Sequence, residues 1–537
     1  MTASNPALQV DANAAWRDVH SANDPVVCTR YEITPTATNP TDRFREVGGA
    51  LKAVLDDAFT NGTPLRVPGG RWSLSNIAKP SGALLDLANH RSIGLAPPSW
   101  FVPAGLIASH AAGVSPVLVS ASMSVNAVNR ELAKLNLALQ TSGASDGQSL
   151  AGAIATGTHG ADVKVGALHD TVLAVHLVVS PTLSVLVQAA GGSLTQSAAD
   201  ALGAWFGIPC SLMSDDRLFR AARVHLGSLG IVLNLVLATV PLYYLVKHSS
   251  PHADGDARWR NVLSTRQPNG ADPSHPTDPD FVQLVLDPYV PEPASDPRAW
   301  VISMQKFPYH GQSGVITQPT DVSLKSDLFD FLPGLVHLYQ DNIELPGNPL
   351  LRVITDAQFK SLYGTTVTSA SAVPGAMFGP PSFLGLDFGT LRGASAEYVF
   401  DATQALTGID TILNTLKSQA DDARRQFLGG IGVRFVRGSD AWLAMNNKPL
   451  NVFVELQSLY TTELPAIHAA IGQALTQAGV PYGGHWGQWA MNTPAVLERW
   501  WTQAAIDAWK AARDEFLPTP GAKAIFSSQL LAASGLE

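Results

Sequence analysis

Cysteine is almost absent from this sequence. Only Cys28 and Cys210 occur among its 537 residues, which excludes a disulfide-stabilised scaffold and a cysteine-rich metal site. Charged residues are also scarce, at 15%, and the net charge of -9 comes without any run of Lys and Arg. Nucleic-acid binding needs a basic surface, so this composition argues against it. The apolar content of 46% is enough for sizeable buried cores, so the chain is not intrinsically disordered.

The sequence also lacks a long hydrophobic run of the kind that crosses a membrane. Its most apolar stretch, residues 226–245, contains Gly227, Gly230, Asn234 and Pro241 and therefore predicts buried strands. The first residues, MTASNPALQVDANAAW, contain no basic region followed by an apolar core, which a secretory leader would show. We therefore expect a cytoplasmic protein with neither a membrane nor a nucleic acid as partner.

The spacing of apolar residues predicts a mixed fold. Helical spacing occurs over residues 42–60, 125–137, 148–157, 216–223, 403–425 and 463–477. Strands are predicted over residues 83–87, 117–120, 171–179, 183–189, 396–400, 432–436 and 451–459. The strands fall in separate groups rather than in regular βαβ units, which indicates an α+β arrangement. The polar, proline-rich residues 249–280 are interpreted as a linker or a long surface loop.

Two glycine-rich segments are the main candidates for a cofactor site. The first, residues 67–76, reads VPGGRWSLSN and follows a short apolar strand; the second, residues 142–160, reads SGASDGQSLAGAIATGTHG. Glycine lets backbone N–H groups approach a ligand closely, and Ser and Thr add hydroxyl donors, so both segments suit phosphate oxygens. Neither contains a Walker loop or a G-x-G-x-x-G fingerprint. Taken singly, each segment is better explained as an ordinary turn.

The second segment also supports a hypothesis from another enzyme class. Residues 143–147 read GASDG and fit the G-x-S-x-G pattern of a nucleophile elbow, with Ser145 as the nucleophile. A catalytic triad would need a later acid and then a histidine, for example His485. The chain lacks the alternating strand and helix pattern of that fold, so a serine hydrolase is the second hypothesis.

Together, the two segments resemble the vanillyl-alcohol-oxidase-type (PCMH-type) FAD-dependent oxidoreductases, specifically the alditol and aldonolactone oxidase branch. PLRVPGGRWSLSNIA is similar to the family's first diphosphate loop, and SLAGAIATGTHGAD is similar to its second FAD-binding segment. DDRLFRAARVHLGSLGIVLNLVLATVP resembles the end of the family's FAD domain. Near the C-terminus, GGHWGQ resembles the P-H-W-G-K motif of this branch, and FSSQLLAASGL resembles its closing segment. The match covers most of residues 43–245 and 396–537.

The resemblance implies an α+β fold with a two-subdomain PCMH-type FAD-binding domain and an α+β substrate (cap) domain that contains an antiparallel sheet. The FAD-binding domain would span residues 1–245 with its core at 43–245, the cap would span 246–484, and residues 485–537 would return to the FAD domain. The implied cofactor is FAD. The residues implied to bind it are Pro68, Gly69, Gly70, Arg71, Trp72, Ser73, Leu74, Ser142, Gly143, Ser145, Asp146, Ser149, Gly152, Thr156, Gly157, Thr158, His159, Gly160, Gly230 and Ile231.

Two departures from the family pattern bear on how FAD is held. Many relatives attach FAD covalently to a histidine of the first loop, where this chain has Trp72. Others use a cysteine of the second segment, and residues 141–160 contain none. An indole ring has no nucleophilic nitrogen at neutral pH, so we expect non-covalent FAD.

The predicted catalytic residues lie on two strands and in the motif near the C-terminus. GVRFVRGSDAWL, residues 432–443, resembles the family's E-I-R-x-V-x-x-D-D-x-W-L strand; it keeps Arg434, Asp440 and Trp442 but has Gly432 in place of the glutamate. The next strand, VFVELQ, places Glu455 and Gln457 on one face. In the C-terminal motif His485 is kept and Gln488 replaces the lysine. Glu455 is the preferred base and His485 the competing one, and no metal is expected.

The resemblance implies that a donor with a CH–OH group, or alternatively a CH–NH group, transfers a hydride to flavin N5. Oxygen is the expected acceptor and would yield hydrogen peroxide. A dehydrogenase with another acceptor, and a protein that holds FAD without catalysis, stay open as alternatives. The expected partners are therefore a small-molecule substrate and an electron acceptor, and the sequence does not identify the substrate.

Overall fold

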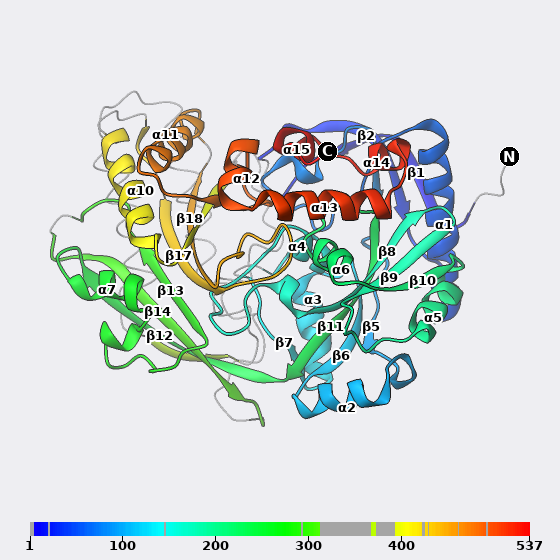
Figure 1. The fold of residues 1–537 in the computed structure, drawn as a ribbon, viewed down its shortest axis with the longest axis horizontal. Coiled ribbons are helices and arrows are strands. Elements are labelled where there is room, and N and C mark those ends of the chain that lie inside the picture. The colour runs from blue at the N-terminus through cyan, green and yellow to red at the C-terminus, as the bar shows by residue number, and fades with distance from the viewer. Residues whose placement is uncertain are drawn as a thin grey trace.

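The computed structural model describes residues 5–19, 22–143, 146–291, 294–311, 367–371, 393–420, 425–427, 429–459, 461–489 and 492–537. These residues form three β-sheets with helices around them. Figure 1 shows the largest sheet and its helices on one side of the molecule and the two other sheets on the opposite side. The helices of the C-terminal part lie along the top of this view.

The N-terminal part forms a small sheet with one long helix beside it. The strand order is β1 (Leu8–Trp16), β2 (Val26–Ile33), β4 (Ala83–Asp86) and β3 (Leu65–Arg66). β1 and β2 are antiparallel, whereas β4 is parallel to β2 and β3. The helix α1 (Pro40–Asn61) confirms the prediction for residues 42–60.

The ends of α1 show why the helix occupies these residues. The side chain of Asn39 accepts a hydrogen bond from the backbone N–H of Asp42 and so caps the first turn. Gly62 adopts the left-handed conformation, with φ of 64°, and ends the helix. The buried residues between these ends recur at helical spacing; they are Val47, Gly48, Ala50, Leu51, Val54, Leu55 and Ala58.

The second sheet has seven strands. Its order is β10 (Cys210–Ser214), β9 (Leu183–Gln188), β8 (Val172–Ser180), β11 (Ile231–Pro241), β6 (Ser115–Ser120) and β5 (Ile93–Leu95), with β7 (Leu137–Leu139) paired to β11. The helices of this part are α2 (Pro103–Ala111), α3 (Val125–Lys134), α4 (Leu150–Ala155), α5 (Gln196–Phe206) and α6 (Asp216–Arg223). The apolar stretch at residues 226–245 thus supplies the central strand β11 and the start of β12, as the sequence predicted.

The third sheet is antiparallel throughout its described pairings. Its order is β15 (Val367–Ser371), β12 (Tyr243–Ala253), β14 (Pro297–Pro308), β13 (Phe281–Leu286), β17 (Gly429–Arg437), β18 (Leu450–Leu459), β16 (Gly393–Asp401) and β19 (Gly483–Gly484). Among the described residues, the helices of the same part are α7 (Ala257–Thr265), α10 (Ala405–Gln419) and α11 (Leu464–Gln477).

The two faces of the third sheet differ in polarity because side chains alternate along each strand. On one face, apolar residues such as Leu284, Val433 and Val454 pack with the buried residues of α7, α10 and α11 in one hydrophobic cluster. The opposite face carries Gln283 and Arg434, which are cross-strand partners, and Glu455 with Glu397, which are partners on β18 and β16. This second face is the polar one, and all four of these side chains are buried.

The interpretation of residues 249–280 as a linker or a long surface loop was wrong for residues 249–265. β12 continues to Ala253, and α7 follows at Ala257–Thr265. Trp259, Val262 and Leu263 form a short apolar stripe on this helix, and all three are buried against the third sheet's hydrophobic cluster. The polar and proline residues around this stripe concealed it in the sequence.

The C-terminal helices connect all three parts of the molecule, since α13 contacts α6 of the second sheet's part, α14 contacts α1, and α12 contacts β19. They are α12 (Pro494–Trp500), α13 (Gln503–Phe516), α14 (Pro520–Ile525) and α15 (Gln529–Ser534). On α13, the indole N–H of Trp509 donates to the carbonyl of Val224 at 3.1 Å, and Arg513 Nε donates to the carbonyl of Ser228 at 3.2 Å. Residues at the far end of the chain are thereby fixed beside the start of β11.

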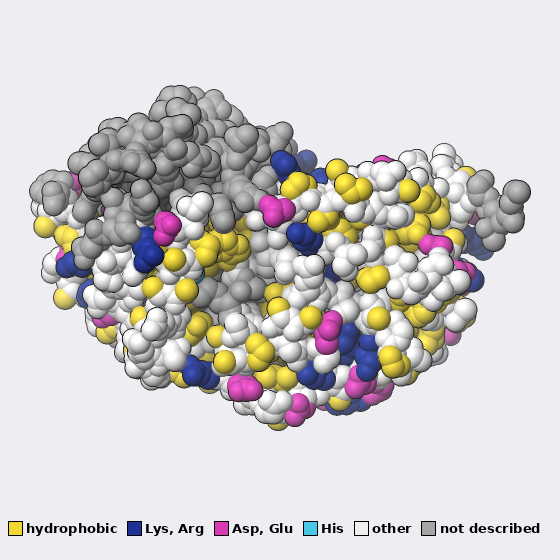
Figure 2. Space-filling view, turned by 90° about the horizontal axis from the view of Figure 1, so that it is seen from above, with side chains coloured by type: hydrophobic (Ala, Val, Ile, Leu, Met, Phe, Trp, Pro, Cys, Tyr) yellow, Lys and Arg dark blue, Asp and Glu magenta, His cyan; other side chains and the backbone are white. Residues whose placement is uncertain are grey.

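No helix within the described ranges is long and apolar enough to cross a membrane. On the face seen in Figure 2, Lys and Arg side chains are interspersed with Asp and Glu among apolar and uncharged groups. The coloured part of that face shows no extended patch of one charge sign.

Candidate functional site

The two glycine-rich segments lie in direct contact. A Cβ atom on Gly69 of the first segment would lie 1.7 Å from Oγ of Ser149 in the second. A Cβ atom on Gly147 would lie 2.1 Å from the Trp72 ring. Because real Cβ atoms do not approach so closely, this contact requires glycine at both positions.

Local hydrogen bonds fix the shape of each segment. In the first, Arg71 adopts a left-handed conformation with φ of 58°, and its carbonyl accepts from the N–H of Val19 at 2.9 Å. In the second, the Ser149 hydroxyl accepts from the N–H of Gly152 at 3.2 Å and caps the short helix α4. Gly157 then turns the chain with φ of 76°.

The predicted residues Gly230 and Ile231 stand at the start of β11, directly after a turn that contacts the second segment and the residue before the first. The N–H of Leu226 donates to the carbonyl of Ala155 at 3.2 Å, at the end of α4. Arg66, which precedes the first segment, donates to the carbonyl of Gly227 at 2.9 Å. Burial beside Arg513 lowers the pKa of Arg66 to about 10.

The C-terminal motif reaches the same place. The carbonyl of Gly487 accepts from the N–H of Leu74 at 2.8 Å, and the hydroxyl of Ser75 donates to the carbonyl of Trp486 at 2.7 Å. A Cβ atom on Gly487 would lie 3.2 Å from Oγ1 of Thr156 in the second segment. Three parts of the sequence therefore meet: the first segment, the second segment and residues 485–488.

Most of the predicted cofactor residues fall within this junction. Pro68 to Leu74 form the loop after β3, and Ser142, Gly143, Asp146, Ser149, Gly152 and residues 156–160 lie along the second segment. Asp146 is buried, which raises the pKa of its carboxyl group, and it accepts from the Asn126 amide at 2.7 Å. Ser145 lies outside the described residues, so its placement as nucleophile or as cofactor ligand stays a prediction.

A chain of ion pairs lies on the polar face of the third sheet, and Arg434 is its centre. Its Nη1 atom is 3.1 Å from Oε1 of Glu397, and its Nη2 atom pairs with Oε2 of Glu455. All three side chains are buried. A lone buried charge is costly, and this arrangement satisfies the arginine with one carboxylate on each side.

The second carboxylate oxygen of Glu455 is held by two polar side chains. The amide of Gln488 donates to Oε1 at 2.8 Å, and the hydroxyl of Ser395 lies 3.1 Å from the same oxygen. The Ser395 hydroxyl is also 3.0 Å from Oε1 of Gln488, so it bridges the strand β16 and the C-terminal motif.

Glu397 connects this chain of ion pairs to the second glycine-rich segment. Its Oε2 atom lies 3.2 Å from Nε2 of His159, whose Nδ1 donates to the carbonyl of Gly160 at 2.9 Å. Burial alone would raise the pKa of Glu397, but His159, His485 and Arg434 outweigh it and lower the pKa to about 2. The carboxylate is therefore charged, and His159 joins it to the second segment.

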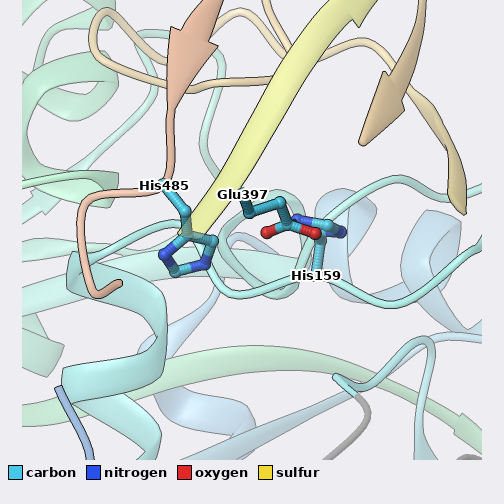
Figure 3. Close-up of side chains that lie close together, drawn as sticks. All are labelled: His159, Glu397 and His485. Carbon is cyan, nitrogen blue, oxygen red and sulfur yellow. The ribbon is translucent and has the colours of Figure 1, made fainter. Parts of the chain in front are cut away.

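His485 completes a compact group with Glu397 and His159, and Figure 3 shows the three side chains together. The potential ligand atoms of these residues all lie within 4.8 Å of one another, a spacing that a divalent metal ion could bridge. The N–H of Gly487 donates to Nδ1 of His485 at 2.9 Å. Burial lowers the pKa of His485 to about 4, although Glu397 and Glu455 oppose the shift.

The structure thus brings together Arg434, Glu455, His485, Gln488 and the cofactor-segment residue His159. Gln457 is not part of the cluster: its side chain is exposed and makes no hydrogen bond to the described residues. Gln457 is the cross-strand partner of Ser395 and lies on the same face of β18 as Glu455, but two residues further along the strand.

Sequence reasoning missed Glu397 and Ser395. Both lie on β16, and Glu397 is the direct cross-strand partner of Glu455, whose other partner is Gly432. Glu397 therefore supplies a carboxylate to Arg434 in a sheet where the family's glutamate position is glycine. The sequence held a signal for Glu397, because this residue alternates with buried apolar residues on the predicted strand 396–400, and Ser395 directly precedes that strand.

Asp440 and Trp442 matched the family pattern but lie away from this cluster. Asp440 pairs with Arg220, at 3.0 Å, and with Arg223, both on α6. The indole N–H of Trp442 donates to the carbonyl of Arg217 at 3.0 Å. These residues join the loop after β17 to the second sheet's part of the molecule, and so they fix the position of Arg434 rather than contact it.

Several buried polar atoms around the junction have no hydrogen-bond partner in the described structure. At the start of the second segment they are Oγ of Ser142 and Oγ1 of Thr141, the residue directly before it; on the polar face of the third sheet they include Oγ of Ser249 and Oε1 of Gln283. Buried polar groups in proteins are normally satisfied, so such atoms indicate where a ligand's polar groups would bind. A cofactor with many hydrogen-bonding groups, such as FAD, fits this distribution.

The comparisons with known proteins agree with the geometry. No protein-family profile matches the chain. A D-arabinono-1,4-lactone oxidase from Yarrowia lipolytica is 30% identical over 203 residues, 38% of this chain and 32% of that one. An L-gulono-1,4-lactone dehydrogenase from Mycobacterium tuberculosis is 28% identical over 198 residues, 37% of each chain. The match thus spans about a third of the length of these curated relatives.

The similarity of the fold covers almost the whole chain. The solved structure of cholesterol oxidase from Brevibacterium sterolicum has a TM-score of 0.62 at 12% identity, over 98% of this chain and 97% of that one. The α+β fold class is therefore confirmed. The fold and the sequence matches together bear out the resemblance to vanillyl-alcohol-oxidase-type FAD-dependent oxidoreductases of the aldonolactone oxidase branch.

The serine hydrolase hypothesis gains no support from this fold. A nucleophile elbow connects a strand of a largely parallel sheet to a helix. Here the strand before the G-x-S-x-G pattern is β7, which has three residues and pairs antiparallel with β11.

Proposed function

We propose that this protein is an FAD-dependent oxidoreductase that oxidises a CH–OH group of a small molecule. The observation that carries the proposal is the junction of the two glycine-rich segments with the ion-paired face of the third sheet, through the contact between His159 and Glu397. Residues 1–245 and 485–537 would hold the cofactor, and residues 246–484 would cap it and contact the substrate.

Two features support FAD as the bound group. Glycine lets the two segments lie in direct contact, with Ser149 and the Trp72 ring at the contact, and glycine-rich loops of this kind suit a diphosphate. The hydroxyls of Thr141 and Ser142, which have no hydrogen-bond partner among the described residues, offer further donors at and directly before the start of the second segment. When bound, FAD supplies the N5 atom that accepts a hydride and passes two electrons to the final acceptor.

We propose that FAD is held without a covalent bond. Trp72 stands at the position of the attachment histidine, and its ring packs against the backbone of Gly147. The only cysteines, Cys28 and Cys210, lie on β2 and β10. Neither belongs to the segments that form the junction.

Glu455 is the proposed base. As a hydride leaves the substrate carbon, the hydroxyl proton passes to a carboxylate oxygen and the C–OH group becomes C=O. Glu397 is the weaker candidate because three cationic or polar neighbours lower its pKa to about 2. Arg434 holds both carboxylates in position, and Gln488 and Ser395 orient Glu455.

The proposed electron acceptor and the range of substrates follow from the similar proteins rather than from individual residues. The similar proteins include a lactone oxidase, a lactone dehydrogenase and a cholesterol oxidase, so both oxygen and another acceptor are compatible with this fold. We propose oxygen, with hydrogen peroxide as the reduced product.

The decisive experiment begins with the absorbance spectrum of the purified protein before and after acid precipitation. We expect a yellow protein that releases intact FAD into the supernatant. Donors are then screened anaerobically for flavin bleaching and aerobically for peroxide, using aldonolactones, sugar alcohols, aromatic alcohols and cholesterol. Flavin retained in the pellet would refute non-covalent binding, and a colourless protein that takes up no FAD would refute the proposed function. Bleaching without peroxide, together with turnover on an artificial acceptor, would identify a dehydrogenase.

A further inference from the structure

The side chain of His485 is held in one tautomer. The backbone N–H of Gly487 donates to its Nδ1 atom at 2.9 Å. A backbone N–H cannot accept a hydrogen bond, so Nδ1 is the acceptor and the ring hydrogen is on Nε2. His485 and Gly487 are two positions apart, so a hydrogen bond within the turn of the motif itself fixes the tautomer.

The ring is also neutral. Because Nδ1 accepts the hydrogen bond from Gly487, it carries no hydrogen of its own. Burial favours the same state and lowers the pKa of His485 to about 4, although Glu397 and Glu455 oppose the shift. At neutral pH the ring therefore carries one hydrogen, on Nε2, and its only lone pair is occupied by Gly487.

This state excludes two roles for His485. A general base needs an available lone pair, and His485 has none while the Gly487 bond persists. A metal ligand needs the same lone pair. His159 and Glu397 already contact each other at 3.2 Å, so the three-residue group has no set of open ligand atoms.

What remains is a hydrogen-bond donor. No side chain in the described ranges accepts a hydrogen bond from Nε2 of His485, and Figure 3 shows the ring beside Glu397 and His159. The same four-residue motif holds the proposed base, because Gln488 donates to Glu455 at 2.8 Å and its own N–H donates to the carbonyl of His485 at 3.2 Å. The motif therefore places an open donor and a carboxylate acceptor near each other.

We propose that His485 donates a hydrogen bond from Nε2 to the substrate oxygen that loses its proton to Glu455. This inference rests on the proposed function. As the proton leaves, negative charge grows on that oxygen, and a neutral N–H donor stabilises the charge more than it stabilises the starting alcohol. No proton leaves His485 during the reaction, and no further reactant is needed.

The kinetic test compares two variants that differ in one property. His485→Gln can place an amide N–H near the position of Nε2, whereas His485→Leu removes the donor. With the fastest donor from the screen above, we expect His485→Leu to lower kcat/KM by ~10²–10³-fold, and His485→Gln to recover at least tenfold of that loss. The acidic limb of the pH profile should stay in place in both variants. Equal losses in both variants, or an acidic limb that disappears with His485, would overturn the proposal.

A spectroscopic arm does not depend on turnover. In two-dimensional NMR of 15N-histidine-labelled holoprotein, the signals absent from His485→Leu identify the ring. We expect protonated Nε2 and unprotonated Nδ1 from pH 5.5 to 8, with no change when zinc chloride is added. Protonated Nδ1, or one equivalent of zinc bound by the wild type and not by His485→Leu, would refute the assignment. Flavin content and thermal melting of each variant separate a folding defect from a lost donor. A wild-type protein that binds no FAD would refute the proposed function, and this inference with it, whatever tautomer is found.

Discussion

Nε2 of His159 lies 3.2 Å from Oε2 of Glu397, although the two residues are 238 positions apart in the sequence. The first belongs to the second glycine-rich segment, and the second belongs to the strand β16 of the large antiparallel sheet. Their contact joins the proposed cofactor site to the proposed substrate site. It also makes Glu397 the residue on which both the stability and the geometry of the site depend.

We predict that Glu397→Gln destabilises the fold, because it leaves His159 without its carboxylate and removes one of the two anions on Arg434. Breaking a buried ion pair typically costs ~3–5 kcal/mol. The free energy of unfolding from urea denaturation measures this loss. Asp278→Asn is the matched control, since Asp278 forms an exposed pair with Lys164 at 2.9 Å and such pairs contribute ~1 kcal/mol or less. Equal effects of the two substitutions would contradict the importance of the buried pair.

Glu455→Gln tests the proposed base. The substitution keeps the shape and the amide can still contact Ser395, but it removes the proton acceptor. Flavin reduction by a true substrate should slow by ~10²–10⁴-fold in stopped-flow measurements. FAD content should be unchanged, because the contacts of Glu455 lie on the third sheet and the C-terminal motif. A slowing of less than about threefold would remove Glu455 from this role.

Gly147→Ala tests the contact between the glycine-rich segments. The new Cβ atom would lie 2.1 Å from the Trp72 ring, so the ring or the segment must move. We expect weaker FAD binding, measured by the flavin-to-protein ratio and by titration of the apoprotein. Gly191→Ala is the control, because a Cβ atom there meets nothing within 4 Å. An unchanged affinity in Gly147→Ala would place the FAD site elsewhere.

His176→Asn should flatten the dependence of stability on pH. Burial, with a smaller effect of His90, lowers the pKa of His176 to about 3 in the folded protein, whereas an unfolded histidine titrates near ~6.5. As the pH falls, the histidine of the unfolded chain takes up a proton before that of the folded protein. The contribution of His176 to the free energy of unfolding is therefore fully present above pH ~6.5 and decreases as the pH falls toward 3.

The size of this effect follows from one proton. Each pH unit within that window costs ~1.4 kcal/mol, so His176 alone accounts for ~2 kcal/mol between pH 7.5 and 5. Unfolding free energies of the wild type and His176→Asn at both values test this. Asparagine can still bond to Asn234, which donates to Nδ1 of His176 at 3.1 Å, but it does not titrate. Parallel pH curves for the two proteins would show that His176 is not buried in its neutral form.

The sequence by itself determined the features that depend on local patterns. Helix α1 follows from apolar spacing between Asn39 and Gly62, and the strands β17 and β18 follow from alternation around Arg434 and Glu455. The glycine segments were also identifiable, because close backbone approach leaves glycine as the only acceptable residue at positions such as Gly69 and Gly147. These constraints depend on the neighbouring residues in the sequence or on the absence of a side chain in glycine.

Only the tertiary structure decided which of these features meet. Asp440 and Trp442 looked as informative as Arg434, yet they contact α6. Glu397 had no motif of its own and became a central residue, because the sheet register places it opposite Glu455 and within reach of His159. Electrostatic pairing of buried charges depends on distances across the fold rather than along the chain. That is the physical reason why the sequence predicted the glycine segments and Arg434, whereas the carboxylate that joins them became visible only in the folded protein.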